Sequence, residues 1–207
     1  YIFFCKSRKD IGLRVVFFLS IYFIFFNFFI LSYQPLRERY YYLIVSISTF
    51  VEFIAVSLLF YKVIGSPRSQ KIILIILLLT GSYLFFSILT SPIDSFNSVL
   101  AGLTYLVFLI YSIYYLFERM KDPTAIYLFS SPVFWVVVAI IIYSAGTFFP
   151  FIYAKNYMAE REFLDLYDLI HDPLYIIRNL FFAFAMLQKD KKLKSNYTAY
   201  GRKKPKP

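Results

Sequence analysis

Residues 71–90 have the sequence KIILIILLLTGSYLFFSILT, in which only Lys71 carries a charge. A helix rises about 1.5 Å per residue, so a run of this length measures about 30 Å, the thickness of the hydrocarbon core of a bilayer. Inside lipid every backbone N–H and C=O group must find its partner within the protein, and a single apolar segment can do so only as a helix. This stretch therefore predicts a transmembrane helix.

The same pattern recurs along the chain, with short charged connectors between the apolar runs. The 207 residues are 60% hydrophobic and 23% aromatic, whereas soluble domains are about 45–50% apolar. We therefore predict an all-α, polytopic integral membrane helical bundle over residues 1–188, followed by a basic, disordered tail at residues 189–207. The six predicted spans lie near residues 15–33, 41–63, 71–90, 97–117, 132–153 and 173–188.

The last predicted span has an unusual approach. Residues 160–171, EREFLDLYDLIH, place apolar and acidic side chains on opposite faces of a helix, which predicts a short helix lying in the membrane interface. Asp172 and Pro173 then resemble the N-cap and first residue of the final span, because a residue before proline avoids the helical region. The final span is short, so the alternative is one helix that continues through a kink.

Basic residues mark one side of the predicted membrane. Alternate connectors and the tail hold 17 of the 22 Lys and Arg residues, so the positive-inside rule places both visible termini in the cytoplasm. Tyr1–Cys5 resembles the end of a further apolar segment, and a helix before it would give the intact protein seven spans. The net charge of +10 thus reflects orientation, and we expect the tail to meet anionic lipids and not nucleic acid.

Two charged residues lie inside predicted spans, where a charge costs a few kcal/mol and is a functional candidate by default. Glu52 and Arg178 each lie ten residues from the cytoplasmic end of their span, so they can pair at one depth. Counted from the outer ends their depths differ, which leaves open an Arg178 that snorkels to the interface. The pair could be structural or could serve a ligand or a proton, and Asn179 adds a polar neighbour.

A second candidate group lies at the outer mouth of the last span. A histidine among carboxylates can titrate near neutral pH, although solvated acids around an exposed histidine are the simpler interpretation. The residues concerned are Asp165, Asp168, His171 and Asp172.

The sequence carries no motif typical of catalysis on a bound nucleotide, an ester or a metal. One cysteine and one histidine provide neither an intrachain disulfide nor a Cys/His metal cluster. We therefore expect no metal, no cofactor and no enzymatic activity.

Three stretches resemble a loosely defined group of bacterial seven-helix membrane proteins. The stretches are FVEF at 50–53 running to FYK at 60–62, FW at 134–135 with IYSAGTFF at 142–149, and IRNLFFAFA at 177–185. In that group the helical unit occurs alone or ahead of a sensor histidine kinase. The resemblance implies a signal-input or accessory module in a bacterial cytoplasmic (inner) membrane.

Three functional hypotheses follow. The first is a non-enzymatic sensory module or accessory, scaffolding subunit that works with a protein partner or a larger membrane complex. The second is a small transporter or channel that uses Glu52 and Arg178. The third is an outer-face membrane enzyme that uses Asp168, His171 and Asp172, with Asp165 beside them.

Overall fold

A computed structural model of the chain describes residues 16–22, 25, 34–92, 95–121, 129, 131–157 and 160–188, with backbone only at 34–39 and 155. The described part is helical, and it contains no strand. Residues 16–22 are helical, and the longer helices are α3 (Gln34–Val63), α4 (Pro67–Thr90), α5 (Ser98–Met120), α6 (Pro132–Tyr157) and α7 (Arg161–Leu187). The all-α bundle predicted from the sequence is confirmed.

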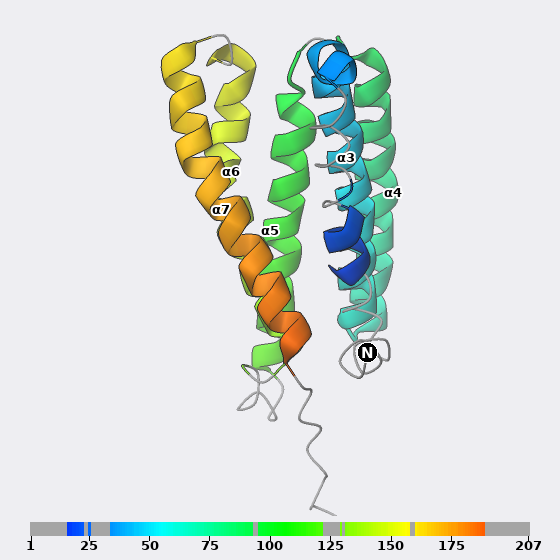
Figure 1. Cartoon of the computed structure of the whole chain (residues 1–207). Helices are drawn as coiled ribbons and strands as arrows, with labels where there is room; N and C mark the ends of the chain where they lie inside the picture. Colours follow the sequence, from blue (N-terminus) through cyan, green and yellow to red (C-terminus); the bar gives the residue numbers. More distant parts are fainter. Residues whose placement is uncertain are drawn as a thin grey trace, which may run out of the picture.

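The helices run up and down, and α5 lies between two pairs (Figure 1). The pair α3 and α4 packs on one side of α5, and the pair α6 and α7 packs on the other. We call the end of the bundle where α7 begins the upper end and the end where α7 stops the lower end, as in Figure 1. Helix α5 therefore lies at the centre of the bundle, with Tyr105, Phe108 and Tyr115 all buried.

Four of the six predicted spans are helices long and apolar enough to cross a membrane. They are Tyr40–Val63, Pro67–Thr90, Ser98–Met120 and Pro132–Ala154. Two helices, α3 and α4, begin earlier than predicted. Pro35 and Pro67 lie in their first turns, where proline is tolerated because the backbone N–H that it lacks would have no partner within the helix. Most of the predicted span at 15–33 and all of the tail at 189–207 lie outside the described residues.

Of the two courses predicted for residues 160–188, the structure has the continuous helix and not a separate interfacial helix at 160–171 followed by a span at 173–188. Helix α7 runs unbroken from Arg161 to Leu187 with Pro173 inside it. A proline within a helix costs about 3 kcal/mol. One stripe of side chains crosses the proline and packs into the bundle on both sides of it, through Tyr167, Leu174 and Phe182. This continuous packing offsets the local preference of Asp172 for an extended conformation.

Helix α4 faces outward. Of the 18-residue apolar stretch that qualifies α4 as a membrane span, only 17% is buried against the rest of the chain, whereas 56% of the corresponding stretch of α5 is buried. Its large side chains, such as Ile75, Leu79 and Phe86, are exposed at helical spacing. A contiguous apolar face of this kind is typical of contact with lipid or with another membrane helix.

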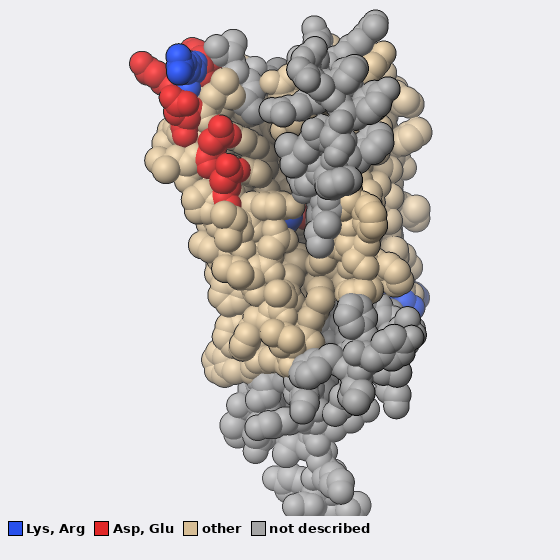
Figure 2. All heavy atoms as spheres, in the orientation of Figure 1, with Lys and Arg blue, Asp and Glu red and all other residues tan. Residues whose placement is uncertain are grey.

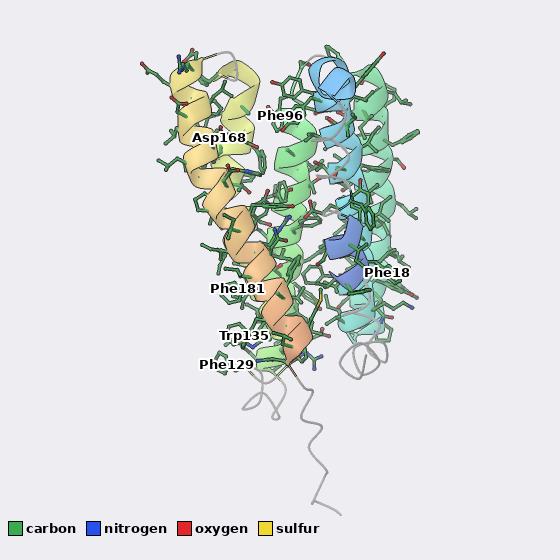
Figure 3. The ribbon with its side chains drawn as sticks, viewed as in Figure 1. Phe18, Phe96, Phe129, Trp135, Asp168 and Phe181 are labelled. Atoms are coloured by element: carbon green, nitrogen blue, oxygen red, sulfur yellow. The ribbon has the colours of Figure 1, made fainter. Side chains whose placement is uncertain are left out.

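The lower ends of α6 and α7 are joined by aromatic rings (Figure 3). Trp135 stacks on Phe181 with ring centroids 5.7 Å apart and meets Phe184 edge-on at 5.0 Å. Its indole N–H donates to the carbonyl oxygen of Phe129 at 2.9 Å. Trp135 therefore fixes the lower end of α7 against α6.

Near the middle of the bundle the same two helices approach closely at Gly146. A Cβ atom placed on Gly146 would collide with the Leu174 side chain of α7. The missing side chain thus lets α7 lie tightly along α6.

Candidate functional site

Glu52 of α3 and Arg178 of α7 form a buried ion pair. The Nη1 atom of Arg178 donates to Oε1 of Glu52 at 2.7 Å, a short, charge-assisted hydrogen bond. Only 3% of the Arg178 side chain and 8% of the Glu52 side chain are exposed. The equal offsets from the lower ends of the two helices indicated that the residues could pair, and of the two alternatives left open, pairing or a snorkelling Arg178, the structure has the pair.

Tyrosines from three helices enclose the pair. The Tyr105 hydroxyl of α5 donates to the second carboxylate oxygen of Glu52, Oε2, at 3.2 Å. The guanidinium carbon of Arg178 lies 4.2 Å from the ring centroid of Tyr143 in α6 and 4.8 Å from that of Tyr175 in α7. Aromatic faces attract a cation, and the attraction is stronger where water is excluded. We call these five residues the ion-pair cluster: Glu52, Tyr105, Tyr143, Tyr175 and Arg178.

A polar path leads from the ion-pair cluster toward the upper end. The Tyr143 hydroxyl is 2.9 Å from Nε2 of His171, and Nδ1 of His171 is 3.0 Å from a carboxylate oxygen of Asp172. Both ring nitrogens of His171 therefore have a polar partner, one in α6 and one in α7. The Asp172 side chain is 68% exposed, so the path runs from an exposed carboxylate to the ring that covers Arg178.

His171 is also held by stacking along α7. Its ring lies parallel to those of Tyr167 and Tyr175, one helical turn away on either side, with centroids 5.2 and 5.9 Å apart. Burial raises the pKa of the Tyr167 hydroxyl well above its usual value, so this ring stays neutral. The ladder Tyr167, His171 and Tyr175 therefore fixes the imidazole toward α6.

The structure divides the predicted outer-mouth group. His171 and Asp172 are in contact, and His171 points inward to Tyr143. Asp165 and Asp168 are exposed on the outside of α7, where acidic side chains gather near the upper end (Figure 2). Among the described residues there is no group of three His, Cys, Asp or Glu side chains that could hold a metal ion.

Asn179 lies next to Arg178 in the sequence but outside the ion-pair cluster. Its side-chain amide donates to the backbone carbonyl of Tyr175 at 2.9 Å, which is a local bond within α7. The polar side chain predicted for this position therefore makes a hydrogen bond within α7 and takes no part in the ion-pair cluster.

The sequence did not single out Tyr105, Tyr143 or Tyr175. The chain has 20 tyrosines, and those near span ends are typical of an interfacial belt. The signal that could have found these three is their depth, because a tyrosine in the middle of a span needs a partner for its hydroxyl.

The ion-pair cluster also determines how α7 meets α3. The backbones of α6 and α7 contact each other extensively, as do those of α5 and α6, whereas α3 and α7 are not a closely packed pair. The long side chains of Glu52 and Arg178 reach across the space between α3 and α7. The contact between these two helices therefore depends on complementary charge more than on close packing.

No family model, no curated protein and no solved structure matches this chain. The resemblance to bacterial seven-helix input modules stays a prediction.

Proposed function

We propose that this chain is a non-enzymatic, multi-pass membrane protein of the bacterial cytoplasmic membrane that acts as a sensory input module or accessory subunit. In this proposal both visible termini are cytoplasmic, and α7 passes the state of the upper, outer end to a protein partner at the tail. The resemblance to seven-helix input modules favours the same role.

The observation that carries the proposal is the course of α7. It begins among exposed acids, passes the polar path from Asp172 and His171, contains Arg178, and ends at Leu187, before the basic tail. An uninterrupted helix transmits displacement from one end to the other. The buried ion pair gives α7 a discrete resting position, because a desolvated charge is stable only where its partner is.

The two alternative functions are less well supported. For a transporter, Glu52 and Arg178 would have to face a passage, yet each neutralises the other under a cover of tyrosine rings. For an outer-face enzyme, the acids and His171 would have to converge on one substrate, yet His171 turns inward while Asp168 is exposed.

Site-specific photo-crosslinking in native membranes tests the proposal. A photoreactive residue at Tyr197 in the tail should capture one defined protein, and the same residue at the lipid-facing position Leu79 of α4 is the matched control. Arg178→Met should change the yield of this crosslinked product at position 197, because the substitution releases α7 from Glu52. Capture of lipid alone at Tyr197, or a yield unaffected by Arg178→Met, would contradict the proposed role.

A further inference from the structure

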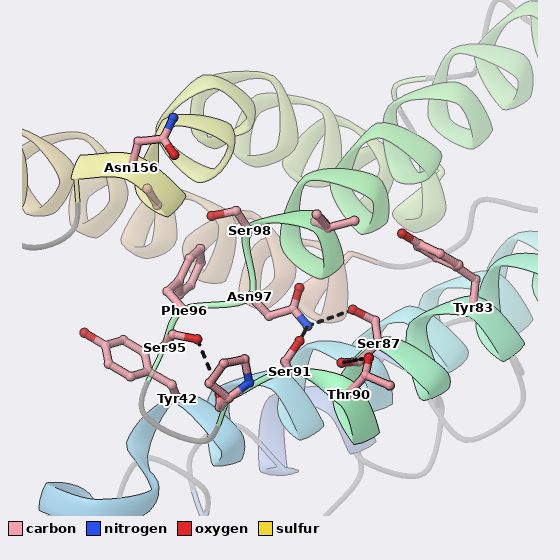
Figure 4. A pocket seen from close by; sticks show the side chains of 13 residues that line it. Tyr42, Tyr83, Ser87, Thr90, Ser91, Ser95, Phe96, Asn97, Ser98 and Asn156 are labelled. Carbon is pink, nitrogen blue, oxygen red and sulfur yellow. Dashed lines mark hydrogen bonds between the residues drawn. The ribbon is translucent and has the colours of Figure 1, made fainter.

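The upper end of the bundle holds a polar cavity remote from the ion-pair cluster. Its volume is about 650 Å³, within the usual range of about 300–1,000 Å³ for small-molecule sites. The ends of α3, α4, α5 and α6 surround it, and its described lining is rich in hydroxyl and amide groups (Figure 4). They come from Tyr42, Tyr83, Ser87, Thr90, Ser91, Ser95, Asn97, Ser98 and Asn156.

Asn97 gives this cavity a fixed shape. Its side-chain oxygen caps α5 by accepting from the backbone N–H of Leu100 at 3.0 Å. Its amide nitrogen donates to the hydroxyls of Ser87 and Ser91 in and after α4, each at 2.9 Å (Figure 4). The wall between α4 and α5 is thus held together by hydrogen bonds, and both serine hydroxyls keep a proton to donate.

Ser98 contributes a buried hydroxyl to this wall. The residue is only 6% exposed, and its hydroxyl has no hydrogen-bond partner. A buried hydroxyl without a partner is costly, and a ligand with polar groups would remove the cost. Ser98 lines the cavity and also the groove that continues from it.

That groove is apolar and runs down the membrane-facing side of α5. Its volume is about 520 Å³, and Tyr83, Ser98 and Val99 belong to both spaces. Gly102, Leu103 and Leu106 of α5 line it together with Phe148 and Ile152 of α6. From Val99 to Leu106 the groove covers two turns, about 10 Å, which accommodates part of an acyl chain.

We infer that the cavity and the groove together bind one lipid of the upper-end leaflet, with an uncharged, hydroxyl-rich head group in the cavity and an acyl chain in the groove. A polar space joined to an apolar one along a membrane-spanning helix matches an amphiphile and not a second apolar helix. None of the described lining residues is charged, so none of them offers a countercharge to an anionic head group. Around the exposed Arg161, the exposed acids Glu162, Asp165 and Asp168 give the described start of α7 a net negative charge, which disfavours anions at this end.

The test uses the full chain in phosphatidylcholine nanodiscs that contain equal amounts of monoglucosyl diacylglycerol, plain diacylglycerol and phosphatidylglycerol. Native mass spectrometry of the released protein should show one retained glucosyl lipid, preferred about tenfold over each competitor. Equal retention of all lipids, preference for phosphatidylglycerol, or a bound second copy of the chain in place of lipid would overturn the inference.

Two variants and a matched control locate the site. Val99→Trp fills the junction of cavity and groove from an exposed position, and it should abolish retention of the glucosyl lipid. Ile113→Trp places the same side chain at an exposed position of α5 outside both spaces, and retention should stay at the wild-type level. Equal retention by the two variants would contradict the assignment.

Ser98→Ala tests the site without adding bulk. It should weaken retention of the glucosyl lipid about fivefold, because one hydrogen bond to the head group is lost. It should leave the melting temperature of the lipid-free protein unchanged or higher, because the unpartnered hydroxyl is gone. Unchanged retention, or a lower melting temperature in lipid-free detergent, would overturn the role of Ser98.

Discussion

Removing one member of the buried ion pair should destabilise the bundle far more than removing both. In Arg178→Met, Glu52 keeps the Tyr105 hydroxyl but loses its countercharge while remaining almost fully enclosed. Leaving a buried charge unpaired costs about 3–5 kcal/mol. The rings of Tyr143 and Tyr175 also lose the cation they cover, which adds up to about 2 kcal/mol.

The double variant Glu52→Met/Arg178→Met removes both charges and replaces them with apolar side chains of similar length. Replacing a buried ion pair with apolar residues often leaves the free energy of unfolding unchanged. One cost remains, because the Tyr105 hydroxyl loses its acceptor, and an orphaned buried hydroxyl costs about 1–3 kcal/mol. Adding Tyr105→Phe should recover most of that loss.

The assay is reversible unfolding of the variants in mixed micelles, analysed as a double-mutant cycle. The two single variants should each lose at least about 3 kcal/mol, and the double variant should lose less than either of them, and so far less than their sum. Additive losses would refute the coupling of Glu52 to Arg178. A triple variant with Tyr105→Phe that is no more stable than the double variant would refute the role given to Tyr105.

Three further predictions follow from the same structure. The proposed orientation can be tested with single cysteines in a Cys5→Ser background. A membrane-impermeant maleimide added to intact cells should label Ser95→Cys at the upper end but not Arg68→Cys at the lower end. Labelling of Arg68→Cys alone would contradict the proposed orientation. Gly146→Val should destabilise the bundle by about 1–3 kcal/mol through collision with Leu174, and Leu174→Ala should relieve the loss; unfolding measurements that find no such rescue would place the strain elsewhere. Because burial raises the pKa of the Tyr167 hydroxyl, its contribution to stability is complete below the ordinary tyrosine pKa of about 10 and is lost as pH rises above it. Tyr167→Phe should therefore show a smaller alkaline loss of melting temperature than the wild type, and equal losses would contradict this effect.

Hydropathy and charge predicted the bundle well because the bilayer leaves few alternatives. Four apolar runs became the helices α3 to α6, and Pro132 begins α6 as the N-terminal preference of proline predicts. The depth of Glu52 and Arg178, counted from the lower ends of their spans, was enough to predict that they could meet.

The errors arose where tertiary packing overrides a local preference. Pro173 by itself favours a helix boundary, but the packed stripe on either side of it keeps α7 continuous. The enclosure of Arg178 was also invisible in the sequence, because nothing in a pattern of 20 tyrosines distinguishes the rings that turn inward from those at the interface. That distinction depends on the rotation of α5 and α6 about their axes, which only the assembled bundle defines.

The central claim is that the buried ion pair holds α7 in one position against α3, and a distance measurement tests it most directly. Spin labels at Lys62 and Leu187, exposed positions at the lower ends of α3 and α7, report the separation of the two helices in nanodiscs. With Cys5 replaced by serine, the otherwise wild-type chain should give one narrow distance distribution, and Arg178→Met should broaden or shift it. Identical distributions for the two proteins would contradict the claim, because α7 would then keep its position without the charge pair.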